Sequence, residues 1–306
     1  MRIDLFVIDG QNDFCASGNE PDSYPTPNGG KRQGALYVAG ADQEAISVAN
    51  MINRLTEKAK NSGHAITINP SLDSHHKNDC SHHTAWKMKD GSSPPPFTVV
   101  PNKDVQEQIV IPRFPVGVFD GVTMPSYKWA LLYTEALERN GRCPLTLWPV
   151  HCEIGTWGNN VYQPLMEAYG NFCETTGRWI NWITKGQNAF TEHYSAFKAD
   201  VVDPTRPETQ MNVNVVQSAA QADYVLWVGW AGSHCLRWTA MDAIDYFDKQ
   251  GNNEFIKKCV FFEDASAPVP NPPGAGAPDF VQWRKDFLNE VEKRGATITN
   301  TKDFMK

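Results

Sequence analysis

The stretch DYVLWVGWAGSHCLRWTAMDAIDYFDKQ, residues 223–250, decides the fold class of this chain. It opens with an apolar run that is typical of a strand buried on both faces of a sheet. From Ser233 onward the apolar residues recur at helical spacing, so a helix follows the strand directly. A buried strand that leads straight into a helix is typical of parallel α/β sheets.

The same alternation of strands and helices extends over most of the chain. The predicted strands lie at about 2–9, 64–73, 179–186, 223–231, 257–265 and 296–304, and the predicted helices at about 41–61, 210–221, 233–250 and 280–295. Such alternation implies a parallel sheet that is covered on both faces and has right-handed crossovers. We therefore predict an α/β protein with a three-layer α/β/α, Rossmann-like fold and a mainly parallel central sheet.

Two stretches interrupt this alternation. Residues 20–38 are rich in Pro, Gly and polar residues, which indicates a surface excursion. Residues 88–146 contain a run of prolines, short apolar pieces and one helix-like segment at 126–140. We find no internal repeat and no independent second core, so we predict one domain over 1–306 with insertions at about 20–38 and 88–146. The second insertion should cover or flank the site.

Charge and composition exclude several classes of partner. The net charge of −7 argues against nucleic acid or an anionic membrane surface as a partner. No apolar run approaches the roughly 18 residues that a membrane span needs. The seven cysteines are scattered without a CxxC pair, which is typical of reduced thiols. We expect a soluble, cytoplasmic protein.

Three residues at predicted strand ends suggest nucleophilic chemistry. Cys235 lies in the first turn of a helix, where free amides and the helix dipole favour a thiolate. Asp9 could accept the thiol proton, and Lys185 could hold both anions. Taken singly, each has a plainer interpretation: a small buried thiol, a turn residue or a solvated lysine. Their shared position at strand ends favours a catalytic group.

A histidine-rich segment, LDSHHKNDCSHH at residues 72–83, suggests a metal site. Asp73 and His75 alternate on an extended segment, so both side chains can point to one side. One or two distant imidazoles, with His151 in WPVHC as a candidate, would complete an O/N site for zinc, iron or manganese. The alternative is a His-rich surface loop without a metal.

Five segments together resemble the nicotinamidase branch of the isochorismatase-like cysteine hydrolases. In order along the chain they are VIDGQNDF (7–14), LDSHH (72–76), LWPVHCEIGTWG (147–158), TKGQNAFTEHYSAF (184–197) and GWAGSHCLRWTAMDA (229–243). The resemblance implies an amidase that converts nicotinamide to nicotinate and ammonia through a cysteine thioester, in NAD salvage. A sibling cysteine amidase that acts on another small amide or carbamoyl compound stays as the alternative.

The resemblance implies a catalytic triad of Asp9, Lys185 and Cys235. It also implies a cis peptide bond between Trp230 and Ala231, with the backbone amides of Ala231 and Cys235 as the oxyanion hole. In this scheme the thiolate of Cys235 attacks the carboxamide carbon and the two amides stabilise the resulting oxyanion.

The family's metal ligands match Asp73, His75 and His151, and His82 is similar to a further ligand of some members, with His83 as the alternative. The implied cofactor is therefore a divalent metal, for which we expect zinc and keep iron and manganese as alternatives.

The remaining implied site residues concern the substrate. Phe14 and Trp148 match aromatic walls around the pyridine ring, and Tyr194 helps to close the pocket. Glu192 resembles an acid that orients the triad lysine, and Gln11 is a further supporting residue. Nicotinamide is the expected small-molecule partner, and a homo-oligomer stays open.

Overall fold

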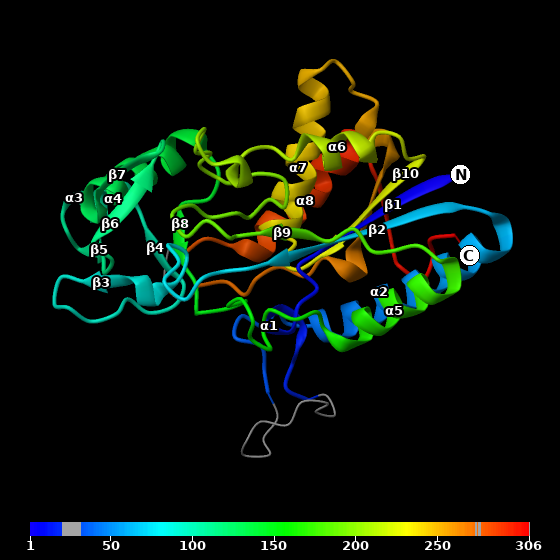
Figure 1. The fold of residues 1–306 in the computed structure, drawn as a ribbon, viewed down its shortest axis with the longest axis horizontal. Coiled ribbons are helices and arrows are strands. Elements are labelled where there is room, and N and C mark those ends of the chain that lie inside the picture. Colours follow the sequence, from blue (N-terminus) through cyan, green and yellow to red (C-terminus); the bar gives the residue numbers. More distant parts are fainter. Residues whose placement is uncertain (20–31, 273, 275–276, 306) are drawn as a thin grey trace.

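A six-stranded sheet in the order β12-β11-β10-β1-β2-β9 forms the centre of the protein (Figure 1). The computed structural model describes residues 1–19, 32–272, 274 and 277–305. Every pairing in this sheet is parallel. Its strands are β1 (Arg2–Ile8), β2 (Ala65–Asp73), β9 (Ile183–Lys185), β10 (Tyr224–Gly229), β11 (Cys259–Phe262) and β12 (Thr297–Thr299).

Helices cover both faces of this sheet. Figure 1 shows α2 and α5 along one side and α6, α7 and α8 along the other. These helices are α2 (Ala41–Ser62), α5 (Gln163–Thr176), α6 (Val213–Ala219), α7 (Cys235–Lys249) and α8 (Phe280–Lys293). The predicted three-layer α/β/α fold with a mainly parallel sheet is confirmed.

The long helix α2 shows how the sequence specifies these layers. Its apolar stripe, which includes Val48, Ile52 and Leu55, is buried, because these residues share the face that meets the core. The helix ends at Gly63, whose φ of 65° is a left-handed conformation that suits glycine.

The carboxyl ends of four neighbouring strands meet at one edge of the sheet. Asp9 follows the central strand β1, and Cys235 begins the helix that comes after β10. Asp73 and Lys185 end β2 and β9 and are register partners. Because parallel strands all end at the same edge, this topology gathers these four side chains into one crevice.

The insertion at 88–146 folds into small antiparallel sheets at one end of the molecule (Figure 1). The pairs are β3 (Trp86–Met88) with β5 (Val110–Pro112), β4 (Thr98–Val100) with β8 (Leu145–Leu147), and β6 (Val116–Phe119) with β7 (Val122–Pro125). The helices here are α3 (Asn102–Gln106) and α4 (Ser126–Asn140), and α4 matches the helix predicted at 126–140. Elsewhere lie α1 (Asn12–Cys15) and short 3₁₀ helices at His83–Ala85, Pro207–Thr209, Phe255–Lys258 and Glu263–Ala265.

This insertion has a second hydrophobic core, which the sequence did not indicate. Trp129 is fully buried at its centre and stacks on Tyr133, with ring centroids 5.1 Å apart. Phe114 and Phe190 pack edge-on against the same indole. Phe190 belongs to the segment that follows β9, so this second core also ties the insertion to the loops of the main sheet.

We predict that Trp129→Ala lowers the free energy of unfolding by about 3–5 kcal/mol, because it opens a large cavity in this second core. Denaturant unfolding followed by circular dichroism measures the change. The matched control is Trp179→Ala, since Trp179 is 80% exposed and its loss should change stability by less than about 0.5 kcal/mol. Equal effects of the two substitutions would contradict this role for Trp129.

The other predicted insertion, 20–38, falls partly on residues 20–31, which lie outside the described residues. Its last part is not a surface excursion, because Leu36 and Val38 are buried. The amide of Val38 donates to the carbonyl of Phe14 at 2.9 Å, which ties this stretch to the short helix α1. Within the described ranges, no helix combines the length and apolar character that a bilayer crossing requires.

Candidate active site

One buried lysine lies between the residues predicted as the triad. Lys185 Nζ is 3.0 Å from Asp9 Oδ2 and 3.7 Å from Cys235 Sγ. It also donates to the carbonyl of His193 at 3.0 Å. The other oxygen of Asp9, Oδ1, accepts from Ser71 Oγ at 2.5 Å. The structure therefore brings Asp9, Lys185 and Cys235 together in a site that water hardly reaches.

Burial dominates the electrostatics of this group. It raises the pKa of the Cys235 thiol well above its usual value, and the nearby Lys185 only partly opposes this effect. Burial also raises the pKa of Asp9, again against the influence of Lys185. For Lys185 burial alone would lower the pKa, but the carboxylates of Asp73 and Asp9 outweigh it and raise the pKa. Burial thus opposes the thiolate that the helix position of Cys235 favours, and a base beside the thiol offsets this effect.

Asp9 is placed to be that base, because its Oδ2 and the Cys235 thiol both lie at Lys185 Nζ, at 3.0 Å and 3.7 Å. Another candidate nucleophile is Cys152, which adjoins His151 in sequence. It is fully buried, and its thiol faces the carbonyl of Gly158 at 3.9 Å. Cys235 lines a small cavity together with Phe14, Trp148 and Tyr194, which we call the candidate cavity. Cys152 does not line it.

The segment before Cys235 has the backbone geometry that the resemblance implies. The peptide bond between Trp230 and Ala231 is cis. Ala231 and Cys235 both line the candidate cavity. Among the described residues, neither of their backbone amides donates a hydrogen bond to a protein acceptor. Both amides are therefore available to a substrate oxygen.

Three buried histidines form a cluster beside the triad. His75, His82 and His151 each offer a ring nitrogen, and these atoms lie within 4.8 Å of one another. Asp73 joins this cluster to the triad, because its Oδ2 is 3.0 Å from His75 Nε2 and its Oδ1 is 2.9 Å from Lys185 Nζ. His151 Nε2 lies 3.4 Å from the same Oδ2.

The outward nitrogen of each ring lies beside a protein acceptor; for His82 and His151 this contact is a hydrogen bond, and for His75 it is a close contact with a carboxylate. The contacts are His75 Nδ1 with Asp79 Oδ2 (3.2 Å), His82 Nδ1 with the Lys77 carbonyl (3.3 Å) and His151 Nδ1 with the Pro149 carbonyl (2.9 Å). A histidine that donates one N–H in this way presents the other nitrogen as a neutral ligand. The resulting set of three imidazole nitrogens and one carboxylate oxygen fits zinc, iron or manganese.

The remaining histidines of the 72–83 segment lie elsewhere. His83 is half-buried, and its Nδ1 faces the Pro94 carbonyl at 3.0 Å. His76 is exposed. Of the two neighbouring alternatives for the metal site, His82 therefore belongs to the cluster.

The three residues predicted to contact substrate, Phe14, Trp148 and Tyr194, line one cavity with Cys235 and Ala231. Trp148 Nε1 donates to the Tyr194 hydroxyl at 3.2 Å. The cavity volume is only about 20 Å³, which is room for water rather than an aromatic ring. Side chains that line the cavity must therefore move before a pyridine ring can bind.

The two residues predicted to support the site, Gln11 and Glu192, contact backbone groups. Gln11 Nε2 donates to the Asp73 carbonyl at 2.7 Å, and Gln11 Oε1 accepts from the Asp73 amide at 2.8 Å. Within the described part of the chain the Glu192 carboxyl has no contact with Lys185 Nζ. It accepts from the amide of His193, whose carbonyl accepts from Lys185. Burial raises the pKa of Glu192 to about 8.

Sequence reasoning missed several residues around the site. Ser71 lies two positions before Asp73 in β2, and this period-two spacing could have identified it. Asn159 donates to the Asp73 carbonyl at 2.7 Å, and no local pattern indicates this contact. His234 packs against Trp148, with ring centroids 5.4 Å apart. Asp79 lies within the histidine-rich segment, but local spacing does not indicate its contact with His75.

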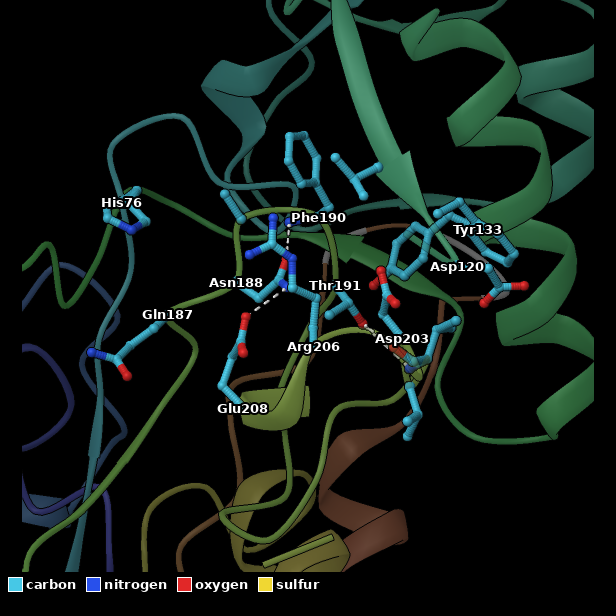
Figure 2. A pocket seen from close by; sticks show the side chains of 15 residues that line it. His76, Asp120, Tyr133, Gln187, Asn188, Phe190, Thr191, Asp203, Arg206 and Glu208 are labelled. Carbon is cyan, nitrogen blue, oxygen red and sulfur yellow. Dashed lines mark hydrogen bonds between the residues drawn. The ribbon is translucent and has the colours of Figure 1, made fainter. Parts of the chain in front are cut away.

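A second cavity, of about 210 Å³, lies between the β6–β7 hairpin and the loops at 187–191 and 201–208. Figure 2 shows His76, Asn188 and Arg206 around it. Among the described residues that line this cavity, none belongs to the triad or the histidine cluster. Phe119 lines this second cavity and does not line the cavity beside Cys235. The aromatic residues of that cavity are Phe14, Trp148 and Tyr194.

Comparison with known proteins supports the fold. No protein-family model and no curated protein matches the chain. Among solved structures, the Acinetobacter baumanii nicotinamidase/pyrazinamidase is 20% identical with a TM-score of 0.55, covering 99% of this chain and 98% of that one. The yeast nicotinamidase bound to the inhibitor nicotinaldehyde is 18% identical with a TM-score of 0.55, covering 98% of this chain and 100% of that one. The chain has the fold of these structures over nearly its whole length.

Proposed function

We propose that this chain is a nicotinamidase that hydrolyses nicotinamide to nicotinate and ammonia through a thioester on Cys235. The observation that carries the proposal is the position of Lys185 Nζ, within 3.0 Å of Asp9, 2.9 Å of Asp73 and 3.7 Å of Cys235. Lys185 therefore contacts the proposed nucleophile Cys235, its proposed base Asp9, and Asp73, which also contacts the histidine cluster. The fold shared with two nicotinamidases supports the same assignment, which would place the protein in cytoplasmic NAD salvage.

The first half of the reaction acylates Cys235. Asp9 accepts the Sγ proton, and the thiolate attacks the carboxamide carbon. The amides of Ala231 and Cys235 stabilise the oxyanion, and one such donor contributes roughly 3–4 kcal/mol. Lys185 balances the negative charge throughout. Asp9 then gives its proton to the departing nitrogen, the C–N bond breaks, and ammonia leaves a thioester behind.

The second half releases the acid. A water molecule attacks the thioester carbon while Asp9 accepts the water proton, and the same amides again hold the oxyanion. The C–S bond then breaks, the proton returns from Asp9 to Cys235 Sγ, and nicotinic acid leaves and loses its proton to solvent as nicotinate. The Asp9 carboxylate and the Cys235 thiol are thereby restored for the next cycle.

The substrate ring would lie between Phe14 and Trp148, close to the histidine cluster. Asp73, His75, His82 and His151 would hold a divalent metal there, with zinc as the first expectation. When bound, the ion would supply an electrophilic anchor for the pyridine nitrogen. These four residues would therefore orient the ring, and the oxyanion amides would position the carboxamide.

We expect the purified protein to contain about one transition-metal ion per chain, since one cluster of suitable ligands is found in the described residues. His75→Ala should lower this content and raise KM for nicotinamide, because the ring nitrogen loses its anchor. Elemental analysis and steady-state kinetics measure both effects. His83→Ala is the matched control and should change neither. A metal-free, fully active wild-type protein would refute the metal site.

A smaller amide or carbamoyl compound is the second candidate substrate, and the cavity volume of about 20 Å³ favours it. Comparing kcat/KM for nicotinamide and for a short aliphatic amide separates the two. The proposal predicts a preference for nicotinamide, since only a pyridine substrate uses both the aromatic walls and the histidine cluster. A preference for the aliphatic amide would favour the sibling amidase.

A further inference from the structure

The carboxylate of Asp79 lies beside the outward ring nitrogen of His75, Nδ1. Asp79 is 1% exposed, and its Oδ2 is 3.2 Å from His75 Nδ1. Its other oxygen, Oδ1, accepts from the Ser81 amide at 3.0 Å and from Ser81 Oγ at 2.9 Å. Two donors therefore fix the orientation of this carboxylate, and one oxygen is left for His75.

His75 differs from its two partners in what holds its outward nitrogen. His82 and His151 face backbone carbonyls, which no side-chain substitution can remove. Among the described residues only His75 has a side-chain acceptor at this position, and that acceptor is charged. A carboxylate beside an imidazole fixes the ring orientation, places the proton on the near nitrogen and raises the basicity of the far one.

We propose that Asp79 is a positioning residue that keeps the proton of His75 on Nδ1 and thereby leaves Nε2 free to bind a divalent metal. The inference rests on the metal-binding part of the proposed function. Asp79 touches neither the substrate nor the ion. It acts through His75, whose Nε2 points toward Asp73 at 3.0 Å and so toward the other ligands.

The substitution Asp79→Asn tests this role with little change in shape. The two Ser81 donors should hold the amide oxygen where Oδ1 now lies, because an amide nitrogen cannot accept their hydrogen bonds. The NH₂ group then faces His75 Nδ1 and favours the tautomer with its proton on Nε2. That tautomer cannot bind a metal through Nε2.

Zinc affinity is measured directly, by competition of the full-length protein with a chromophoric chelator. We expect Asp79→Asn to raise the dissociation constant for Zn²⁺ by about 10–100-fold, the usual effect of losing such a partner. The matched control is Asp242→Asn, because Asp242 is a similarly buried carboxylate that pairs with Lys198 at 3.2 Å, outside the cluster. Its zinc affinity should equal that of the wild type.

Added zinc should restore nicotinamide turnover by Asp79→Asn, with kcat at saturating metal close to the wild-type value. A variant that was merely misfolded would not recover in this way. If Asp79→Asn does not fold, Ser81→Ala replaces it. This variant keeps the carboxylate but removes one of the two donors that orient it, and it should weaken zinc binding severalfold.

The outcomes separate this inference from the proposed activity. Equal zinc affinities of the wild type and the folded variant would overturn the role of Asp79 and leave the nicotinamidase proposal intact. A wild-type protein that binds zinc without hydrolysing nicotinamide would reject the activity, while a weakened Asp79→Asn site would still support the positioning role. A wild-type protein that binds no zinc would overturn the inference together with the metal site.

Discussion

Cys235→Ala should lower ammonia release from nicotinamide by roughly 10⁴-fold or more, the scale expected when a covalent nucleophile is removed. Cys235 begins helix α7 and lines the cavity, with its Sγ 3.7 Å from Lys185 Nζ. Without the thiol no thioester can form, and only positioning and the oxyanion amides remain. A coupled assay for ammonia, run on wild type and variant at equal concentrations, measures the loss.

The control for this substitution is Cys152→Ala, whose thiol lies outside the cavity and should be dispensable for the chemistry. Both variants should keep the wild-type circular dichroism spectrum and metal content. A Cys235→Ala protein that keeps a tenth of the wild-type rate would contradict covalent catalysis and require a route without an acyl-enzyme.

Lys185→Ala should lower activity nearly as far and should also destabilise the protein. Lys185 Nζ lies between the buried carboxylates of Asp9 and Asp73, at 3.0 Å and 2.9 Å. Its loss leaves these two buried carboxylates without the lysine between them, and breaking a buried ion pair costs about 3–5 kcal/mol of stability. Assays should be run well below the lowered unfolding temperature, so that kcat reports the folded variant.

The double variant Lys185→Ala/Cys235→Ala should be little less active than Cys235→Ala, because residues that act as one unit are not additive. Lys257→Ala is the matched control, since Lys257 forms an exposed pair with Glu254 and should affect neither rate nor stability. Full additivity of the two single losses would show that Lys185 and Cys235 act independently.

The sequence predicted the main sheet well because its strands are buried and alternate with long helices. Strand β10 and helix α7, for example, match the stretch at 223–250 within a few residues. The small sheets of the insertion could not be predicted in the same way. Strands such as β3 and β5 contain 3 residues each, which is too short for a period-two pattern.

The second core escaped prediction for a related reason. It is assembled around Trp129 and Tyr133 from segments that are distant in sequence, and Phe190 comes from the segment that follows β9. No local window contains enough of these residues to reveal a shared cluster. The helix at 126–140 was visible, but what its apolar face packs against was not.

Local sequence patterns also could not predict every residue of the candidate site. Local spacing could pair Asp73 with His75, but it could not choose between His82 and His83. That choice depends on the 3₁₀ turn that begins at His83 and on the Pro94 carbonyl that this ring contacts. The protonation state of Cys235 likewise depends on burial, which a helix position alone does not reveal.

The most direct test is a time course of nicotinate and ammonia formation by the purified, metal-loaded wild-type chain supplied with nicotinamide. The proposal predicts that both products form in equal amounts, with kcat/KM of about 10⁴ M⁻¹s⁻¹ or higher. Prior alkylation of Cys235 should abolish both. A folded, metal-loaded protein that releases neither product from nicotinamide would contradict the proposed function.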